Sequence, residues 1–334
     1  MLPITDWRGP RTEATPPRGR IRRCATRTAV LAIGAMMAAS PSAAAQVSDD
    51  EPEPTAPGQQ LDAMIGESCA DTYVLGVRGS NEPPKGAAAT TAPGSVVYPE
   101  GTEGLGMGPT VHAFFESFGT YRARSGESVP AGFGIDYPAV RVGEGLLLYP
   151  MVYRDSVDAG AANLRGALEQ ISAACGDSGT EVVVAGVSQG ADVINTALAT
   201  EQGQGTDAFG LVTRIVLFGD PSRSAAQSTI TAGAERGEGI FRMVPLSGFG
   251  QDGWMASNPR VISVCIPGDS VCDPASDPAD AGNVTGADGM SPFDRHQAYI
   301  DPGVQLRCPG TSDDGAFLDG TSCAASLVAM PTSR

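Results

Sequence analysis

The feature that most constrains this chain is the segment Gly186-Val187-Ser188-Gln189-Gly190, which joins a valine-rich run to a helical pattern. Residues 181–187 are almost entirely apolar, as expected of a strand that is buried on both faces. Residues 191–200 have the apolar spacing of a helix. Glycines on either side of the serine permit a tight, strained turn. The segment therefore predicts a strand–turn–helix unit of an α/β sheet.

Strand and helix patterns alternate along the middle of the chain. The predicted strands cover residues 72–78, 132–137, 181–187, 212–218 and 261–265, and the predicted helices cover residues 110–121, 151–174 and 191–200. Strands separated by helices indicate βαβ units, and hence a mainly parallel sheet flanked by helices in one domain. Residues 231–259 mix apolar side chains with glycines, which fits an apolar flap or a core segment equally well.

The N-terminal residues have the pattern of an export signal. Five arginines between Arg18 and Arg27 precede an apolar run over 29–39 and a small-residue site before Gln46. This pattern is typical of a secretory signal peptide, and the run is too short to span a bilayer. The Arg22-Arg23 pair leaves both the general and the twin-arginine export route open. We expect a secreted protein without stable membrane insertion, organised as a signal peptide (1–45), an acidic, proline-rich linker (46–67), a folded domain (68–305) and a C-terminal tail (306–334).

Composition narrows the function classes. The net charge of −16 leaves no basic surface to neutralise phosphates, so we expect no nucleic-acid partner. Because the chain has only two histidines and no CxxC pair, we expect no metal site. We also expect the protein to be a monomer. Cys24 lies in the predicted signal, and an even number of remaining cysteines in an exported chain indicates three disulfides of open pairing. Those cysteines are Cys69, Cys175, Cys265, Cys272, Cys308 and Cys323.

Ser188 is the candidate nucleophile. A G-x-S-x-G sequence between a buried strand and a helix is the context of a nucleophile elbow, where the helix N-terminus faces developing negative charge. A serine nucleophile needs a base. In α/β-hydrolases with a nucleophile elbow the catalytic residues follow one another along the chain in the order Ser, Asp, His, so the base must be a histidine after Ser188. Only His296 satisfies that order. His112 precedes the serine on an amphipathic helix and is interpreted as a surface or packing residue.

The candidate acid is Asp269. Cys265 and Cys272 lie seven residues apart after a predicted strand and can close a small loop that fixes this carboxylate. Most of the other aspartates between Ser188 and His296 fall in loops rich in proline and glycine, where we expect them to be solvated. The full set in this interval is Asp192, Asp207, Asp220, Asp252, Asp269, Asp273, Asp277, Asp280, Asp288 and Asp294.

Together these motifs resemble the cutinases and the bacterial cutinase-like serine esterases. The resemblance covers about residues 69–300 and implies a single-domain α/β-hydrolase of the cutinase type, with a mainly parallel sheet and disulfides. It does not extend to the tail, and residues 273–290 form a longer stretch than in small members of the family. The matching segments are Cys69-Ala70-Asp71, Arg78-Gly79-Ser80-Asn81-Glu82, Asp136-Tyr137-Pro138, Gly186–Gly190, Phe218-Gly219-Asp220-Pro221 and the Cys265–Cys272 loop with its downstream His296.

The resemblance implies a role for each matching residue. It makes Ser188 the nucleophile, His296 the base and Asp269 the acid that orients the base. It makes Ser80 and the backbone N–H of Gln189 the oxyanion hole. It also implies the disulfides Cys69–Cys175 and Cys265–Cys272, which leaves Cys308 to pair with Cys323.

The function implied by the resemblance is that of a secreted serine esterase acting in lipid degradation. It would hydrolyse carboxylic esters (a cutin-like polyester, lipid esters or short-to-medium acyl esters) through an acyl-enzyme, with no metal or other cofactor. One alternative is an acetylxylan-type polysaccharide deacetylase, because that activity shares the fold. Another is a catalytically silent secreted binding protein.

Overall fold

The structure, a computed structural model, describes residues 61, 65, 68–80, 82, 104–141, 149–227, 229–243, 253–276, 278–310 and 315–330. Residues 1–53 and 54–334 form two separate units, and every described residue lies in the second. The predicted signal peptide and nearly all of the predicted linker therefore lie outside the described residues.

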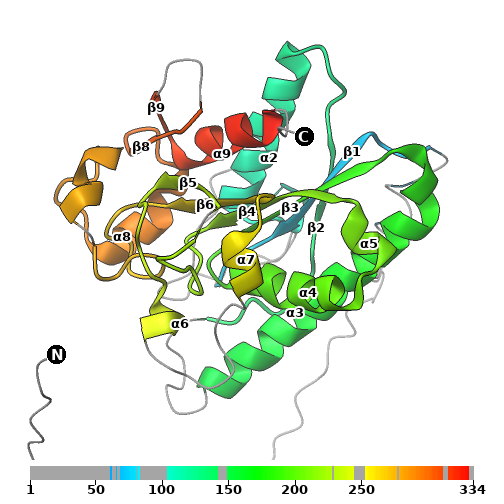
Figure 1. Ribbon diagram of the computed structural model, residues 1–334, viewed down its shortest axis with the longest axis horizontal. Coiled ribbons are helices and arrows are strands. Elements are labelled where there is room, and N and C mark those ends of the chain that lie inside the picture. Colours follow the sequence, from blue (N-terminus) through cyan, green and yellow to red (C-terminus); the bar gives the residue numbers. More distant parts are fainter. Residues whose placement is uncertain are drawn as a thin grey trace, which may run out of the picture. The chain divides into compact units, whose positions relative to one another are not determined.

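A six-stranded sheet in the order β2-β1-β3-β4-β6-β5 forms the centre of the second unit (Figure 1). All its strand pairs are parallel, so the predicted parallel sheet is confirmed. The interior strands are almost entirely buried, as required of a sheet covered on both faces. The strands are β1 (Thr72–Val77), β2 (Ala131–Gly134), β3 (Glu181–Val187), β4 (Val212–Phe218), β5 (Ile230–Gly233) and β6 (Val261–Cys265).

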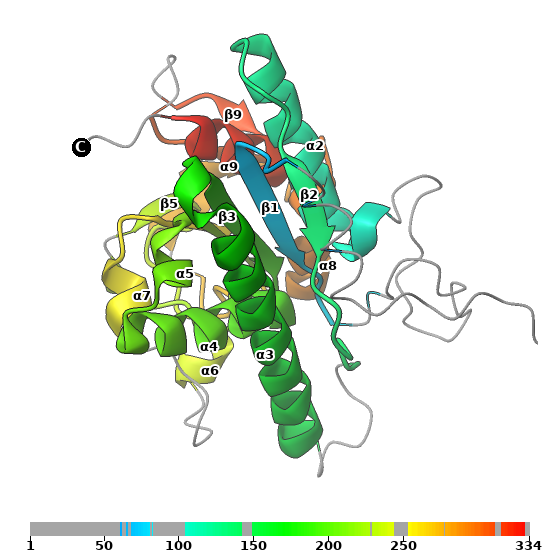
Figure 2. The same ribbon diagram turned by 90° about the vertical axis from the view of Figure 1, so that its right-hand side faces the viewer.

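Helices cover the two faces of the sheet (Figure 2). One face carries α2 (Pro109–Arg124) and α9 (Gly320–Ala329), which contact each other. The other carries α3 (Tyr149–Cys175), α4 (Gln189–Gln204), α5 (Asp207–Gly210) and α7 (Gly253–Ser257). The predicted spacing holds in α2, where Val111, Phe114 and Phe118 are buried.

Short elements occupy the connections. Three strands form a separate antiparallel sheet in the order β7-β8-β9. The short elements are η1 (Gly104–Gly106), η2 (Gly176–Ser178), α6 (Ile240–Met243), η3 (Pro278–Asn283), β7 (Val284–Thr285), α8 (Pro292–Gln297), η4 (Ala298–Ile300), β8 (Gln305–Arg307) and β9 (Phe317–Leu318).

The segment 231–259 divides between the two expected roles. Its first residues belong to β5, an edge strand of the main sheet, and Met255 is buried in the core. In contrast, Ile240 and Met243 of α6 are exposed. Residues 244–252 lie outside the described residues. The segment is thus partly core and partly an apolar surface.

The C-terminal tail belongs to the same compact unit as the predicted domain. Its helix α9 contacts β4, β5 and β6 and carries a nearly continuous run of buried residues. The Cys308–Cys323 disulfide joins this helix to the chain that follows β8. The long stretch over 273–290 is also folded against the body, because buried Asp280 accepts hydrogen bonds from the backbone N–H of Glu235 and from Asn283.

The strands of the main sheet end at a common level. Val77 pairs with Gly186, and Val187 pairs with Phe218, which in turn pairs with Val264. The loops that leave these strand ends therefore meet at one edge, the usual location of a site in an open α/β sheet. None of the helices in the described ranges is long and apolar enough to span a bilayer.

Candidate active site

Ser188 lies in the turn between β3 and α4 with a backbone φ of 54°, in the left-handed region that strains a non-glycine residue. Its N–H donates to the carbonyl of Phe218 at 2.9 Å, which fixes the turn against β4. A Cβ on Gly190 would overlap the carbonyl oxygen of Val77, and one on Gly186 would lie 2.7 Å from the Gly190 carbonyl. Both glycines are therefore required by the close approach of backbone around the serine.

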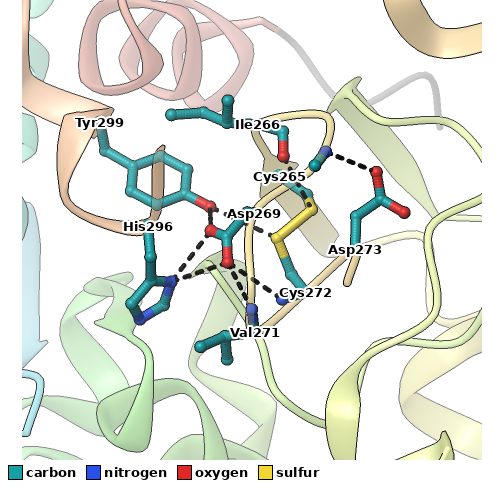
Figure 3. Close-up of polar contacts among 9 residues, drawn as sticks. Cys265, Ile266, Asp269, Val271, Cys272, Asp273, His296 and Tyr299 are labelled. Carbon is teal, nitrogen blue, oxygen red and sulfur yellow. Dashed lines mark hydrogen bonds and ion pairs between the residues drawn. A yellow bond between two sulfur atoms is a disulfide. The ribbon is translucent and has the colours of Figure 1, made fainter. Parts of the chain in front are cut away.

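Asp269 lies in the loop after β6 that the Cys265–Cys272 disulfide closes (Figure 3). Its carboxylate is fully buried. Oδ1 accepts hydrogen bonds from the backbone N–H groups of Val271 at 2.7 Å and Cys272 at 3.3 Å. The loop's own backbone thus holds one carboxylate oxygen in a fixed position.

His296 is presented to this carboxylate by α8. The helix begins at Ser291, which forms a reciprocal capping box with Asp294. The Nδ1 atom of His296 lies 3.0 Å from Oδ1 and 2.9 Å from Oδ2 of Asp269. Because Nδ1 is engaged by the acid, Nε2 is left on the far edge of the ring, where a base would act.

Arg295 fastens α8 to the loop of Asp269. Its guanidinium donates to the carbonyl of Pro267 at 2.5 Å and to that of Ala287 at 3.0 Å. A second link runs from the N–H of Ser270 to the carbonyl of Pro292 at 3.0 Å. The elements that carry the acid and the base are therefore joined by direct hydrogen bonds.

The charge on Asp269 is stabilised in spite of its burial. Burial alone would raise the pKa of this carboxyl group. The neighbouring His296 and hydrogen bonds from His296, Tyr299 and Val271 outweigh that effect, and the pKa lies below its ordinary value. Asp269 is therefore an anion that can stabilise a protonated imidazole at Nδ1.

The turn that carries Ser188 and the ring of His296 both contact the end of β4. Phe218 accepts the hydrogen bond from the Ser188 N–H, and the next residue, Gly219, lies against the ring of His296. A Cβ on Gly219 would lie 2.7 Å from Cε1 of that ring, so glycine is required there. Among the hydrogen bonds of the described residues there is none between Ser188 Oγ and His296. Free enzymes often hold this pair apart until substrate binds.

The predicted oxyanion residues flank the serine. Gly79 lies beside Ser188, because a Cβ built on it would be 3.6 Å from the serine Cβ. The next residue is Ser80, whose Oγ is buried with no hydrogen-bond partner among the described groups. Gln189 is the first residue of α4, where backbone N–H groups have no partner inside the helix. Its side chain accepts a hydrogen bond from Ser156 at 3.1 Å.

The loop of Ser80 is held by two charged residues to which the sequence assigned no role. Arg78 is buried and donates to the carbonyls of Glu82 at 2.8 Å, Ile135 at 3.2 Å and Tyr137. The Glu82 carboxylate accepts the N–H of Gly79 at 2.7 Å. Burial raises the pKa of Glu82 to about 7, against the opposing hydrogen bond from Gly79. Both residues belong to the segment Arg78–Glu82 that matches the family. That match is the only feature of the sequence that points to them.

The expectation that most other aspartates are solvated is wrong for four of them. Asp192 accepts hydrogen bonds from the hydroxyls of Tyr153 at 3.2 Å and Ser222 at 3.3 Å, and burial together with Asp220 raises its pKa to about 7. Among the described aspartates, Asp269 alone bonds to His296. Of the aspartates of this set that the structure describes, the buried ones are Asp192, Asp220, Asp269, Asp273 and Asp280.

His112 is 8% exposed on α2, 4.0 Å from the carboxylate of Glu116. The sequence left open whether His112 is a surface or a packing residue, and its burial makes it a packing residue of that helix. No hydrogen bond or ion pair joins it to the described residues of the candidate site.

The fold and the site define the class of this protein: an α/β-hydrolase in which a serine turn and a histidine–aspartate pair meet at the carboxyl edge of a parallel sheet. The family model described as Cutinase matches residues 68–301. The chain belongs to the cutinase family of carboxylic ester hydrolases, as its motifs predict. No curated protein matches the sequence.

Several solved structures resemble this one at low sequence identity. A cutinase-like protein from Cryptococcus sp. is 21% identical, with a TM-score of 0.42 over 63% of this chain and 82% of that chain. The catalytic core of the acetyl xylan esterase from Trichoderma reesei is 20% identical, with a TM-score of 0.41 over 64% and 90%. A Trichoderma reesei cutinase with a phosphonate inhibitor is 20% identical, with a TM-score of 0.35 over 64% and 72%. This likeness carries no information on substrate.

Proposed function

We propose that this protein is a secreted serine esterase that cleaves carboxylic esters through the triad Ser188, His296 and Asp269. The observation that supports this most is the hydrogen-bonded Asp269–His296 pair, which lies at the same sheet edge as a serine held in a strained turn. A buried ion-pairing carboxylate behind a histidine has no purpose in packing, since it costs desolvation. Its use is to fix the tautomer of a base and to stabilise that base when protonated.

In the proposed reaction, Ser188 Oγ attacks the ester carbonyl while Nε2 of His296 takes the serine proton. Asp269 stabilises the imidazolium, and the N–H of Gln189 with the Ser80 hydroxyl receives the negative charge on oxygen. His296 then returns the proton to the departing alcohol, which leaves an acyl group on Ser188. A water molecule, activated by the same base, releases the acid. No step requires a metal or another cofactor.

The substrates proposed are esters with an apolar acyl part, namely a cutin-like polyester, lipid esters or short-to-medium acyl esters. Several large apolar side chains are exposed on the segments around the site, where α6 and α8 lie at the same end of the sheet (Figure 1). They are Met151 and Val152 at the start of α3, Ile240 and Met243 of α6, and Phe293 of α8. Such a surface fits a hydrocarbon chain better than a polysaccharide.

Secretion is proposed from the N-terminal signal pattern together with the disulfides. The three disulfides, Cys69–Cys175, Cys265–Cys272 and Cys308–Cys323, are the pairs implied by the family resemblance. Disulfides of this kind form in oxidising compartments. N-terminal sequencing of protein recovered from culture medium should give a start near Gln46, and retention of the intact chain inside cells would contradict export.

The proposed activity is tested by combining a covalent probe with a substrate series. A fluorophosphonate should label wild-type protein at Ser188 and fail to label the Ser188→Ala variant. Hydrolysis of p-nitrophenyl esters from acetate to palmitate, measured beside acetylated xylan, then identifies the acyl length. Folded wild-type protein that is neither labelled nor active would be a binding protein, and preference for acetylated xylan would make it a polysaccharide deacetylase.

A further inference from the structure

Asp269 has a polar neighbour that the triad itself does not include. Tyr299, in η4, donates its hydroxyl to Oδ2 of Asp269 at 2.5 Å (Figure 3). The tyrosine is fully buried, and its ring packs edge-on against Phe218 with centroids 5.7 Å apart. It follows His296 by three residues and stands at right angles to the imidazole, 6.4 Å away. We propose that Tyr299 is a positioning residue, which holds the Asp269 carboxylate in the rotamer that faces His296.

The two oxygens of the carboxylate are held differently. Oδ1 is held by the backbone N–H groups of Val271 and Cys272, which no side-chain replacement removes. Among the described residues, Oδ2 receives hydrogen bonds only from His296 and Tyr299. Without the Tyr299 hydroxyl, Oδ2 would depend on the imidazole that it is meant to orient. The tyrosine therefore makes the position of the acid independent of the base.

The surroundings of the hydroxyl fit this role. The oxygen lies 3.4 Å from the disulfide sulfur of Cys272 and 3.2 Å from the place where a Cβ on Gly219 would be. Burial raises the pKa of Tyr299 well above its ordinary value, and the charge of Asp269 adds to this. The phenol thus stays a donor throughout the pH range in which an esterase works. Such short bonds to a carboxylate are about twice as strong as neutral ones.

The hydrogen bond also affects the basicity of His296. Donation by Tyr299 draws negative charge from Asp269 and so reduces its stabilisation of the imidazolium. Loss of the hydroxyl should therefore raise the pKa of His296. It should also lower kcat, because the Asp269 carboxylate is then less firmly held against His296. The other charged groups around the pair are Glu82, which interacts with His296, and Arg223, which interacts with Tyr299. Both are unchanged in a Tyr299 variant, so their effects cancel in the comparison.

The inference rests on the proposed serine-esterase function, and its test compares Tyr299→Phe with wild type and with Tyr73→Phe. Tyr73 is also fully buried, and its hydroxyl accepts the backbone N–H of Ala70 at 3.1 Å and lies 4.0 Å from the disulfide sulfur of Cys175, at the opposite end of β1. We expect Tyr299→Phe to lower kcat about tenfold, equivalent to about 1.4 kcal/mol, with KM within about twofold of wild type. The acid limb of the pH profile should move to higher pH. Tyr73→Phe should change neither.

A second readout does not depend on activity. The chain has only two histidines, so their ring protons can be followed separately by NMR titration, with His112 as the internal reference. The pKa of His296 should rise in Tyr299→Phe. It should fall when 3-fluorotyrosine, a stronger donor of the same shape, replaces Tyr299, and this variant keeps the test decisive if the phenylalanine protein does not fold. Active, labelled wild type whose kcat and His296 pKa are the same in the Tyr299 variants overturns only this inference. Wild type that is inactive and unlabelled overturns the esterase itself.

Discussion

The position of Ser188 is set by its glycine neighbours, which have no side chains. The turn around it depends on the absence of side chains at Gly186 and Gly190, and not on any packing of the serine hydroxyl. Ser188→Ala should therefore leave thermal unfolding nearly unchanged and lower kcat on the order of 10⁴-fold or more. The measurement is p-nitrophenyl ester hydrolysis beside a thermal melt, and a variant with a tenth of wild-type turnover would contradict the assignment.

The two histidines provide the matched comparison at this scale. His296→Ala removes the group bonded to Asp269 and should reduce kcat by a factor similar to that of Ser188→Ala, because members of a triad act as a unit. His112→Ala should stay within a few-fold of wild type, since His112 lies on α2 and bonds to no described site residue. The reverse pattern would overturn the order of residues assumed for the triad.

Asp192 makes stability depend on pH in an unusual direction. Burial and the nearby Asp220 raise the pKa of Asp192 from its ordinary value to about 7, so the folded protein keeps a proton that the unfolded chain releases. This contribution is complete below about pH 4 and is lost as the pH rises through about 7, a change of roughly 4 kcal/mol at most. Asp192→Asn should flatten that part of the denaturation profile between pH 4 and 8. The exposed control Asp155→Asn should retain it, and identical profiles for wild type and Asp192→Asn would refute the assignment.

The residues of the proposed triad could be selected from the sequence because their signal is local. Ser188 lies in a five-residue motif, and Asp269 lies between two cysteines of a short loop. The residues that support them were missed, because their contacts join distant parts of the chain. Nothing near Tyr299 in the sequence indicates that its hydroxyl reaches Asp269, and nothing near Asp192 indicates that it is buried beside Tyr153.

At the scale of elements, we predict that the loop between Cys265 and Cys272 contributes more to the proposed triad than to the stability of the fold. It closes over a separation of only seven residues, for which the chain-entropy model gives about 2.5 kcal/mol. Replacing both cysteines with serine should lower the melting temperature modestly and reduce kcat about tenfold, because Asp269 loses part of its fixed geometry. Unchanged turnover would mean that the links from Arg295 and Tyr299 position the carboxylate without the disulfide.

Long elements with a clear period could be predicted, and short ones could not. The strands β1, β3, β4 and β6 and the helices α2, α3 and α4 follow their apolar patterns closely. The strand β2 ends at Gly134, earlier than its apolar run suggests, because the pairing with β1 stops there. The edge strand β5 and the two-residue strands β7 and β9 carry too few residues for a period, and tertiary contacts define them.

At the scale of the whole unit, the Cys69–Cys175 disulfide should act on stability alone. It joins the chain before β1 to the end of α3 over a separation of 106 residues, for which the chain-entropy model gives about 5 kcal/mol. Both cysteines lie at the amino end of the sheet, whereas Ser188 and Asp269 follow the carboxyl ends of β3 and β6. Replacing both with serine should therefore lower the melting temperature more than loss of the Cys265–Cys272 pair does. Turnover per folded molecule, counted by active-site labelling, should stay near that of wild type. If this variant instead loses turnover while its melting temperature is unchanged, the prediction is wrong: the Cys69–Cys175 disulfide then supports turnover and not stability.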